Sequence, residues 1–344
     1  MKSFQTILSI SLVLVMTLGL AASSQAQDEA RQEAVNLYNE GQELARANDY
    51  DNAIAMFREA LEVAEENQFD DIVEFVTEQL PGVYQSRATD AYRTYQSERT
   101  VESANTAIEY FQDAEEVAGE FGNEEVAQRA RGAIPQLYYV RGVLEYRMED
   151  YEGSLESLDT AIEMNPNLPA PYYQKAVVLK RVNPEDIETA LEWYDQAIEA
   201  AQNANDTRTL QNAREGAHDE LVFRGTNLAE ERQFDRAIEL LNKALEYNNS
   251  SADAHYRLAE VYNLRSNWSS ALEHANQALE LEGGGVTDRA KIYFELGTAY
   301  KGSGDKDNAC DAFENATYGE FSDPANHELQ FVLKCEGHVA NSGS

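Results

Sequence analysis

The side chains that could do chemistry in this chain do not form a recognisable catalytic or metal-binding pattern. The five His are scattered, and the segment His327-Glu328-Leu329-Gln330-Phe331 begins like a zinc-protease helix but has Phe in place of the second zinc ligand. The sequence has no phosphate-binding P-loop, no dinucleotide-binding glycine fingerprint and no nucleophile elbow. Its many Asp and Glu pairs are typical of solvated helix surfaces. We therefore expect no enzymatic activity, no catalytic residues, no cofactor and no metal site.

The charge of the chain argues against nucleic acid as a partner. The 344 residues include 27 Lys and Arg against 62 Asp and Glu, a formal net charge of -35. Binding to phosphates depends on Lys and Arg, which are scarce here. The acid-rich stretches 62–78 and 113–125 carry no basic residue. Two explanations of the acidity stay open: attraction of a cationic partner over about one Debye length, roughly 8 Å at physiological salt, or adaptation to a salty habitat.

The amino-terminal sequence predicts export. Lys2 precedes an apolar run from Ile7 to Ala22, and Ser24-Gln25-Ala26 places small residues where a signal peptidase reads. We expect a signal peptide over residues 1–26, and a periplasmic or secreted protein, because the short leader resembles bacterial ones. The run is shorter than the roughly 20 residues that span a bilayer, although an uncleaved anchor is the alternative. We expect no direct membrane insertion after cleavage.

Export would place the two cysteines, Cys310 and Cys335, in an oxidising space. They either form one disulfide, which would stabilise the carboxyl-terminal end by roughly 3 to 4 kcal/mol, or remain as two buried thiols. The sequence leaves both alternatives open.

A short pattern returns along the chain at a spacing near 34 residues. Its clearest copy is Tyr293-x-x-Leu296-Gly297-x-x-Tyr300, followed by Ala309-x-x-x-Phe313-x-x-Ala316. This copy closely resembles the tetratricopeptide repeat, a pair of helices with the pattern W-x2-L-G-x2-Y and then A-x3-F. In other copies a small residue of the first helix stands 12 positions before a small residue of the second, as in Gly41/Ala53, Gly142/Ser154, Gly225/Ala237 and Ala259/Ala271.

The resemblance implies an all-α fold, a right-handed α-solenoid of antiparallel helix pairs with about seven units between residues 27 and 323. A copy with Ala176 and Ala190 needs two extra residues, at the turn Asn183-Pro184-Glu185. A capping helix is predicted over 324–336 and a flexible tail over 337–344. The units are predicted at residues 34–67, 70–126 (degenerate), 135–168, 169–204, 218–251, 252–285 and 290–323.

Small residues in the first helices are interpreted as packing notches. Two helices approach within about 8 to 10 Å only where the contacting side chains are small. Large side chains such as Phe57, Leu158, Leu241 and Phe313 are expected to fill the space between adjacent units. The predicted notches are Gly41, Gly142, Ala176, Gly225, Ala259 and Gly297.

Two regions depart from the repeat. In the unit over 70–126 the segment Ile72 to Gln96 has no glycine notch and contains Pro81-Gly82, which predicts longer helices of uncertain register. Beyond Pro324, the apolar residues Leu329, Val332 and Leu333 fall on one face and predict a helix that covers the last unit.

An aromatic ring stands three residues before most of the notches. In related proteins this position looks toward the concave groove, so the rings would form a ladder on which an extended peptide stacks. The alternative is that the rings pack between neighbouring first helices. The candidate groove-lining residues are Tyr38, Tyr139, Tyr173, Tyr256 and Phe294, with Val222 in place of a ring in one copy.

The resemblance implies a binding function. The first hypothesis is a non-catalytic interaction module of the cell envelope or secreted fraction that holds a peptide or helix of a partner protein in its groove. The second is a structural scaffold or self-assembling adaptor without a single groove ligand, which leaves homo-oligomers open. An acidic peptide tail is disfavoured, since only Lys180, Lys291 and Lys301 are placed to help bind one.

Overall fold

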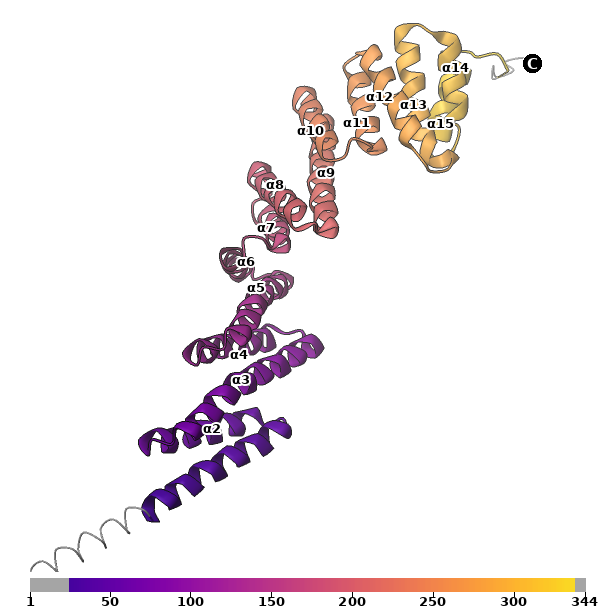
Figure 1. Cartoon of the computed structure of the whole chain (residues 1–344). Helices are drawn as coiled ribbons and strands as arrows, with labels where there is room; N and C mark the ends of the chain where they lie inside the picture. Colours follow the sequence, from indigo (N-terminus) through magenta and orange to yellow (C-terminus); the bar gives the residue numbers. More distant parts are fainter. Residues whose placement is uncertain (1–24, 338–344) are drawn as a thin grey trace, which may run out of the picture. The chain divides into compact units, whose positions relative to one another are not determined.

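The computed structural model describes residues 25–337, which contain helices and turns and no β-strand (Figure 1). The predicted signal-peptide run and residues 338–344 of the predicted tail lie outside this range. The chain divides into two compact units, Met1–Val182 and Asn183–Ser344, called unit 1 and unit 2 below. The division falls inside the predicted repeat 169–204, at its turn Asn183-Pro184-Glu185.

In the described part of unit 1 the first helix runs through residues 25–46. Successive helices contact one another, and the first helix of a pair also contacts the first helix of the next, as α3 contacts α5 and α5 contacts α7. The first helices are residues 25–46, α3, α5 and α7, and the second helices are α2, α4 and α6. Their bounds are α2 (Tyr50–Glu66), α3 (Asp70–Glu98), α4 (Val101–Glu120), α5 (Glu124–Arg147), α6 (Tyr151–Met164) and α7 (Pro169–Val182).

Unit 2 repeats the arrangement, with α9 contacting α11 and α11 contacting α13 beside the contacts between successive helices. The all-α solenoid predicted from the sequence is confirmed. The helices are α8 (Ile187–Ala204), α9 (Thr207–Glu230), α10 (Phe234–Tyr247), α11 (Ala252–Leu264), α12 (Trp268–Leu281), α13 (Val286–Ser303), α14 (Lys306–Asn315) and α15 (Ser322–His327).

Glycines in the first helices lie directly against large side chains of their own helix pair. A Cβ atom at Gly225 would lie 2.7 Å from Leu241, and one at Gly297 would lie 2.8 Å from Phe313. Gly142 would meet Leu158 at 2.9 Å. Real Cβ atoms are not found this close to other carbons, so alanine does not fit without a shift. These large side chains therefore fill the notch of their own hairpin. The sequence had predicted that they fill the space between adjacent units.

Two further glycines receive a ring from the preceding second helix. Gly216 of α9 faces Tyr194 of α8, with a hypothetical Cβ 2.8 Å from the ring, and Gly302 of α13 faces Trp268 of α12 at 2.5 Å. Tyr194 is fully buried there. Close contact between successive hairpins thus also depends on glycine, at positions outside the repeat pattern.

The turns before α2, α4, α6, α10, α12 and α14 share one backbone feature. In each of these turns a residue in the left-handed region is followed by the N-cap residue of the second helix. Asp150 is such an N-cap residue, and its side chain accepts a hydrogen bond of 3.1 Å from the Gly153 amide. This cap satisfies an amide that the helix itself leaves free. The left-handed residues are Asn48, Arg99, Glu149, Arg232, Ser266 and Gly304, whereas the turn before α8 has none.

The degenerate region folds into the long helices α3 and α4. α3 continues through Pro81 for 29 residues, and α4 follows with 20. Thr100 begins α4 with a capping box, since its side chain accepts from the Ser103 amide at 3.1 Å. Because α3 is longer than α2, its end extends beyond α2, and the residues there are available for binding.

The carboxyl-terminal cap is a short helix and a π-helical turn, α15 (Ser322–His327) and η2 (Glu328–Val332), preceded by the 3-10 turn η1 (Gly319–Phe321). It is therefore shorter than the predicted helix 324–336. Leu329 is fully buried against the last hairpin, whereas Val332 is 49% exposed, so the predicted apolar face was wrong at this residue. The π turn advances the chain less per residue than an α-helix and rotates Val332 out of that face.

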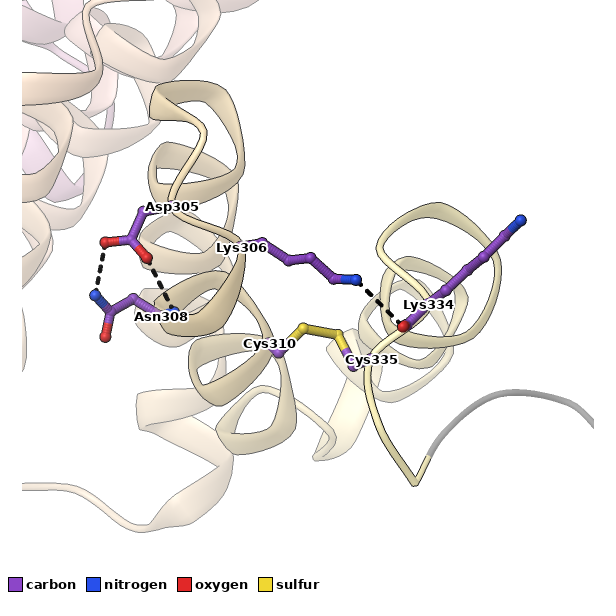
Figure 2. Close-up of a disulfide and its surroundings, with 6 residues drawn as sticks. All are labelled: Asp305, Lys306, Asn308, Cys310, Lys334 and Cys335. Carbon is purple, nitrogen blue, oxygen red and sulfur yellow. Dashed lines mark hydrogen bonds between the residues drawn. A yellow bond between two sulfur atoms is a disulfide. The ribbon is translucent and has the colours of Figure 1, made fainter.

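Figure 2 shows that Cys310 of α14 and Cys335 after η2 are joined by a disulfide, with their Cα atoms 5.9 Å apart. Beside it the Lys306 ammonium lies 3.5 Å from the Lys334 carbonyl oxygen. Of the two alternatives left open by the sequence, the structure contains the disulfide, which fixes the cap to the last hairpin.

Candidate binding site between α3 and α5

The last turns of α3 present two opposite faces to two different pockets. Asp90, Thr94 and Glu98 line a pocket toward α2 and α4, whereas Tyr92 and Tyr95 line one toward α5. The spacing of three and four residues within each set puts each on its own side of the helix. One helix end thus separates an acidic pocket from an aromatic one.

The aromatic pocket lies between two neighbouring first helices. It has a volume of about 550 Å³, within the range of sites that hold small ligands or single side chains. We call it the Tyr-Arg pocket. Its lining residues are Tyr92, Tyr95, Gln96 and Arg99 from the end of α3, and Tyr139, Val140, Val143, Leu144 and Arg147 from α5.

Its rings are partly covered and close to two guanidinium groups. The rings of Tyr92 and Tyr95 lie 5.9 Å apart in a tilted arrangement. Burial raises the pKa of Tyr95, Tyr92 raises it further, and Arg99 and Arg147 act in the opposite direction. Both arginines line the same pocket as Tyr95.

The two arginines at the pocket have no anionic partner. Among the residues that the structure describes, neither the Arg99 nor the Arg147 side chain forms a hydrogen bond or an ion pair, and both are exposed. Each stands at the end of a first helix, where the negative end of the helix dipole favours a cation. In a chain with a net charge of -35 two unpaired cations at one pocket are conspicuous.

The acidic pocket on the other face of α3 contains a cation, Arg87, that is already paired within the protein. Arg87 is paired with Asp51 at 3.2 Å and with Asp113, and its guanidinium lies 4.0 Å from the centre of the Tyr110 ring. Its side chain is only 14% exposed. Arg87 therefore links α2, α3 and α4, and its charge is balanced by carboxylates of the same chain.

The rings of the predicted ladder have different surroundings in the structure. Tyr139 lines the Tyr-Arg pocket. Tyr38 packs edge-on against Phe57 at 5.6 Å, and Phe294 packs edge-on against Phe313 at 5.4 Å. In these two hairpins the ring three residues before the glycine covers the same large side chain that fills the glycine notch.

The remaining ladder positions do not form an open stacking surface. Tyr256 is buried, with 6% of its surface exposed, and packs with Ala259 and Ile292, in agreement with the alternative that the rings pack between neighbouring first helices. Its ring is covered because Arg257 and Lys291 lie over it, at 5.0 and 4.8 Å from its centre. Tyr173 is partly buried in α7. Val222 is buried in α9.

Ala176 and Ala259, the two predicted alanine notches, are completely buried in α7 and α11. Gly41, a weaker notch than the other glycines, would place a Cβ atom 3.2 Å from the Phe57 ring. The predicted small positions thus lie at helix contacts.

Tyr92, Tyr95, Arg99 and Arg147 were not among the site residues predicted from the sequence. A signal was present, since Tyr92, Tyr95 and Arg99 follow one another at helical spacing at the end of α3. It was not used because the unit had no glycine from which to set its register.

Neither a metal site nor a membrane span is found in the described residues. No group of three or more His, Cys, Asp or Glu side chains there is placed to hold a metal ion. None of the helices between residues 25 and 337 combines the length and the apolar character needed to cross a bilayer.

Comparison with known families gives tetratricopeptide repeat matches at residues 34–67, 135–168, 228–284 and 290–318. No curated protein has a significantly similar sequence.

Solved structures to which this chain is similar include tetratricopeptide repeat proteins. YrrB, described as a tetratricopeptide repeat protein with an unusual peptide-binding site, is 19% identical with a TM-score of 0.33, and the match covers 57% of this chain and 90% of YrrB. The C-terminal part of a repeat protein from Cytophaga hutchinsonii is 13% identical with a TM-score of 0.40, covering 84% of this chain and 98% of that one. BtubC from P. vanneervenii is 18% identical with a TM-score of 0.35, covering 67% and 92%.

The pattern of notches, the stacked helix pairs and the four matched segments agree, and the chain is a tetratricopeptide repeat protein, one of a family of protein–protein interaction modules.

Proposed function

We propose that this chain is an exported interaction module that holds a segment of a partner protein at the Tyr-Arg pocket of unit 1. The observation that carries the proposal is the meeting of exposed, unpaired Arg99 and Arg147 with three tyrosines at a pocket between two first helices. Rings with polar tips and arginines are the side chains that contribute most binding energy at protein interfaces. The other arginines in the described part of unit 1 have a hydrogen-bond or ion-pair partner within the chain, as Arg87 does.

The pocket offers an apolar wall beside its polar groups. Val140, Val143 and Leu144 supply aliphatic surface from one face of α5, and Tyr139 supplies a ring. A side chain of a partner placed against this wall would be removed from water, at roughly 25 cal/mol per Å² of apolar surface. The pocket suits one large side chain of a bound segment better than a flat protein surface.

Site-specific photo-crosslinking tests this function. Benzoylphenylalanine at Tyr139, on the pocket, and at Met164, exposed at the end of α6, is introduced into the full chain in its native cell. We expect the Tyr139 probe to join one partner at one short segment, identified by mass spectrometry, and the Met164 probe to give no such product. Equal products from both positions would contradict the proposed site.

A separate measurement tests the scaffold hypothesis. Light scattering of the purified chain from Gln27 onward should give a monomer if unit 1 acts alone as a binding module. Assembly that grows with concentration and survives the change Tyr139→Ala would favour the scaffold.

Export to a periplasmic or extracellular space is the second part of the proposal. The Cys310–Cys335 disulfide supports it, because disulfides persist in oxidising compartments and are rare in the cytosol. Amino-terminal sequencing of the protein recovered from the envelope or the medium should begin at Gln27. Recovery of the intact chain from the cytosol would contradict export.

A further inference from the structure

We infer that the partner segment carries a carboxylate, from Asp or Glu, next to a large apolar side chain, and that Arg99 and Arg147 bind this carboxylate while the α5 wall binds the apolar group. The inference rests on the proposed function and specifies the chemistry of its ligand. It reverses the expectation that an acidic segment is disfavoured.

The arginines of unit 1 give the first argument. Every other Arg in the described part of unit 1 has a hydrogen-bond or ion-pair partner within the fold. The partnered arginines are Arg31, Arg46, Arg58, Arg87, Arg93, Arg129, Arg131, Arg141 and Arg181. Arg99 and Arg147 are the exceptions in residues 25–182, and the same pocket holds both. Folding therefore leaves two positive charges available at one place on an acidic molecule.

The helix ends give the second argument. A base at a helix end is explained by the helix dipole alone only if it recurs at helix ends in general. The second helices α2, α4 and α6 have no base in their last turn. The first helices have a base in the last turn or at the C-cap, at Arg46, Arg99, Arg147 and Arg181. Among the described helix ends of unit 1, positive charge is thus found at those of the first helices.

The shape of the two functional groups gives the third argument. A guanidinium group presents paired N–H donors that match a carboxylate, and charge-assisted hydrogen bonds of this kind are stronger than neutral ones. The pocket that Arg99 and Arg147 line is also lined by Tyr139, Val143 and Leu144. A ligand that satisfies both parts has a negative and an apolar group on adjacent residues.

The overall charge limits how acidic the ligand can be. With a net charge of -35 the chain repels polyanions as they approach. A segment with one or two carboxylates among apolar residues keeps the local attraction and avoids most of that repulsion. A nucleic acid does not meet this condition.

The test selects random eight-residue peptides displayed on phage against the full chain from Gln27 onward. The consensus peptide is then synthesised with blocked ends, together with a version in which its Asp or Glu is changed to Asn or Gln. We expect selected peptides to carry Asp or Glu beside Leu, Phe or Tyr. Removing the charge should weaken binding at least about tenfold, and added salt should weaken the charged peptide more than the neutral one.

Protein variants assign the effect to the pocket. In the double variant R99Q/R147Q the charged and neutral peptides should bind alike, whereas in R93Q they should still differ about tenfold. Arg93 is a matched control because it is on α3, 68% exposed, and outside the pocket. Circular dichroism and urea unfolding should be unchanged in both variants.

The outcomes separate the two proposals. If Y139A abolishes peptide binding but R99Q/R147Q leaves the preference for the charged peptide intact, the pocket binds proteins and the carboxylate inference is wrong. If neither change affects binding of the selected peptides, the proposed site is wrong as well. Selection of basic or uncharged consensus peptides also contradicts the inference.

Discussion

The Ser154 hydroxyl donates a hydrogen bond of 2.7 Å to the carbonyl oxygen of Gly142, and both residues are buried between α5 and α6. The two residues are 12 positions apart, the spacing at which small residues recur in the repeat. A small residue at each position lets the helices come close enough for a side chain of one to reach the backbone of the other. The repeat spacing therefore records a contact across the hairpin.

The contact predicts opposite effects for two glycines of the same helix. A Cβ atom at Gly142 would lie 2.9 Å from Leu158 and 3.1 Å from the Ser154 carbonyl oxygen, whereas one at Gly132 would meet nothing within 4 Å. Replacing Gly142 by Ala should lower the free energy of unfolding by about 1 to 2 kcal/mol, because overpacking outweighs the helix propensity of Ala. Replacing Gly132 by Ala should raise it by about 0.5 to 1 kcal/mol. Urea unfolding measures both, and equal shifts would contradict the interpretation of Gly142 as a packing notch.

A buried carboxyl group in unit 2 predicts a pH-dependent stability. Glu295 of α13 is 8% exposed and accepts a hydrogen bond of 2.7 Å from the Asn263 side chain of α11. Burial raises the pKa of Glu295 from 4.5 to about 7, although the bond from Asn263 lowers it. The folded state therefore holds the proton more tightly than the unfolded state. The stability from this group is fully present below about pH 4.5 and is lost as the pH rises to about 7, by about 3 kcal/mol.

The change Glu295→Gln should remove this dependence. Gln stays neutral and can still accept the bond from Asn263, so the variant should be more stable than the wild type at pH 8 and similar at pH 5. The exposed residue Glu239 provides the control, and its change to Gln should leave the pH profile as it is. Urea midpoints between pH 4.5 and 8 give the comparison, and a wild-type slope retained in E295Q would refute the assignment.

A histidine pair in the same unit predicts the opposite slope. The Nδ1 atoms of His255 and His274 are 3.0 Å apart, and the His274 ring stacks on Tyr262. Burial lowers the pKa of both histidines, and His274 lowers that of His255 further. The folded state therefore disfavours their protonation, and the stability from the pair is present above the ordinary pKa of about 6.5 and lost as the pH falls below it.

The histidine effect is best measured in the E295Q background, where the opposing titration is absent. Changing His274 to Gln should flatten the decrease in urea midpoint between pH 7.5 and 5. Changing the exposed His327 to Gln should leave that decrease in place. An unchanged acid limb in the His274 variant would show that the pair does not titrate as proposed.

The disulfide predicts that reduction loosens the carboxyl-terminal cap. Cys310 and Cys335 close a loop that contains α15 and η2, and loss of a bond of this span costs roughly 3 to 4 kcal/mol. Dithiothreitol should lower the urea midpoint of the wild type and should not affect a double variant with Ser at both positions. Proteolysis of the reduced protein should begin beyond Phe313. Identical unfolding curves with and without the reductant would contradict a stabilising role.

Sequence alone determined the helix pairs and the small residues at which they meet. Repeated small residues such as Gly225 and Ala237 predict close antiparallel helices, because only small side chains permit that approach. These contacts join residues close in the chain, so a short pattern encodes them. Pairing of Cys310 with Cys335 was foreseen only as one of two alternatives.

The tertiary structure determined the features that the repeat pattern does not encode. Tyr95 and Arg147 come together only because α3 and α5 are neighbouring first helices, and α3 outgrows the standard repeat. The burial of Tyr256 and the raised pKa of Glu295 depend on several helices at once. The spacing of a repeat records which residues share a hairpin, but a binding pocket or a buried charge is made by side chains from different hairpins, and their meeting depends on helix lengths and packing angles that no single repeat specifies.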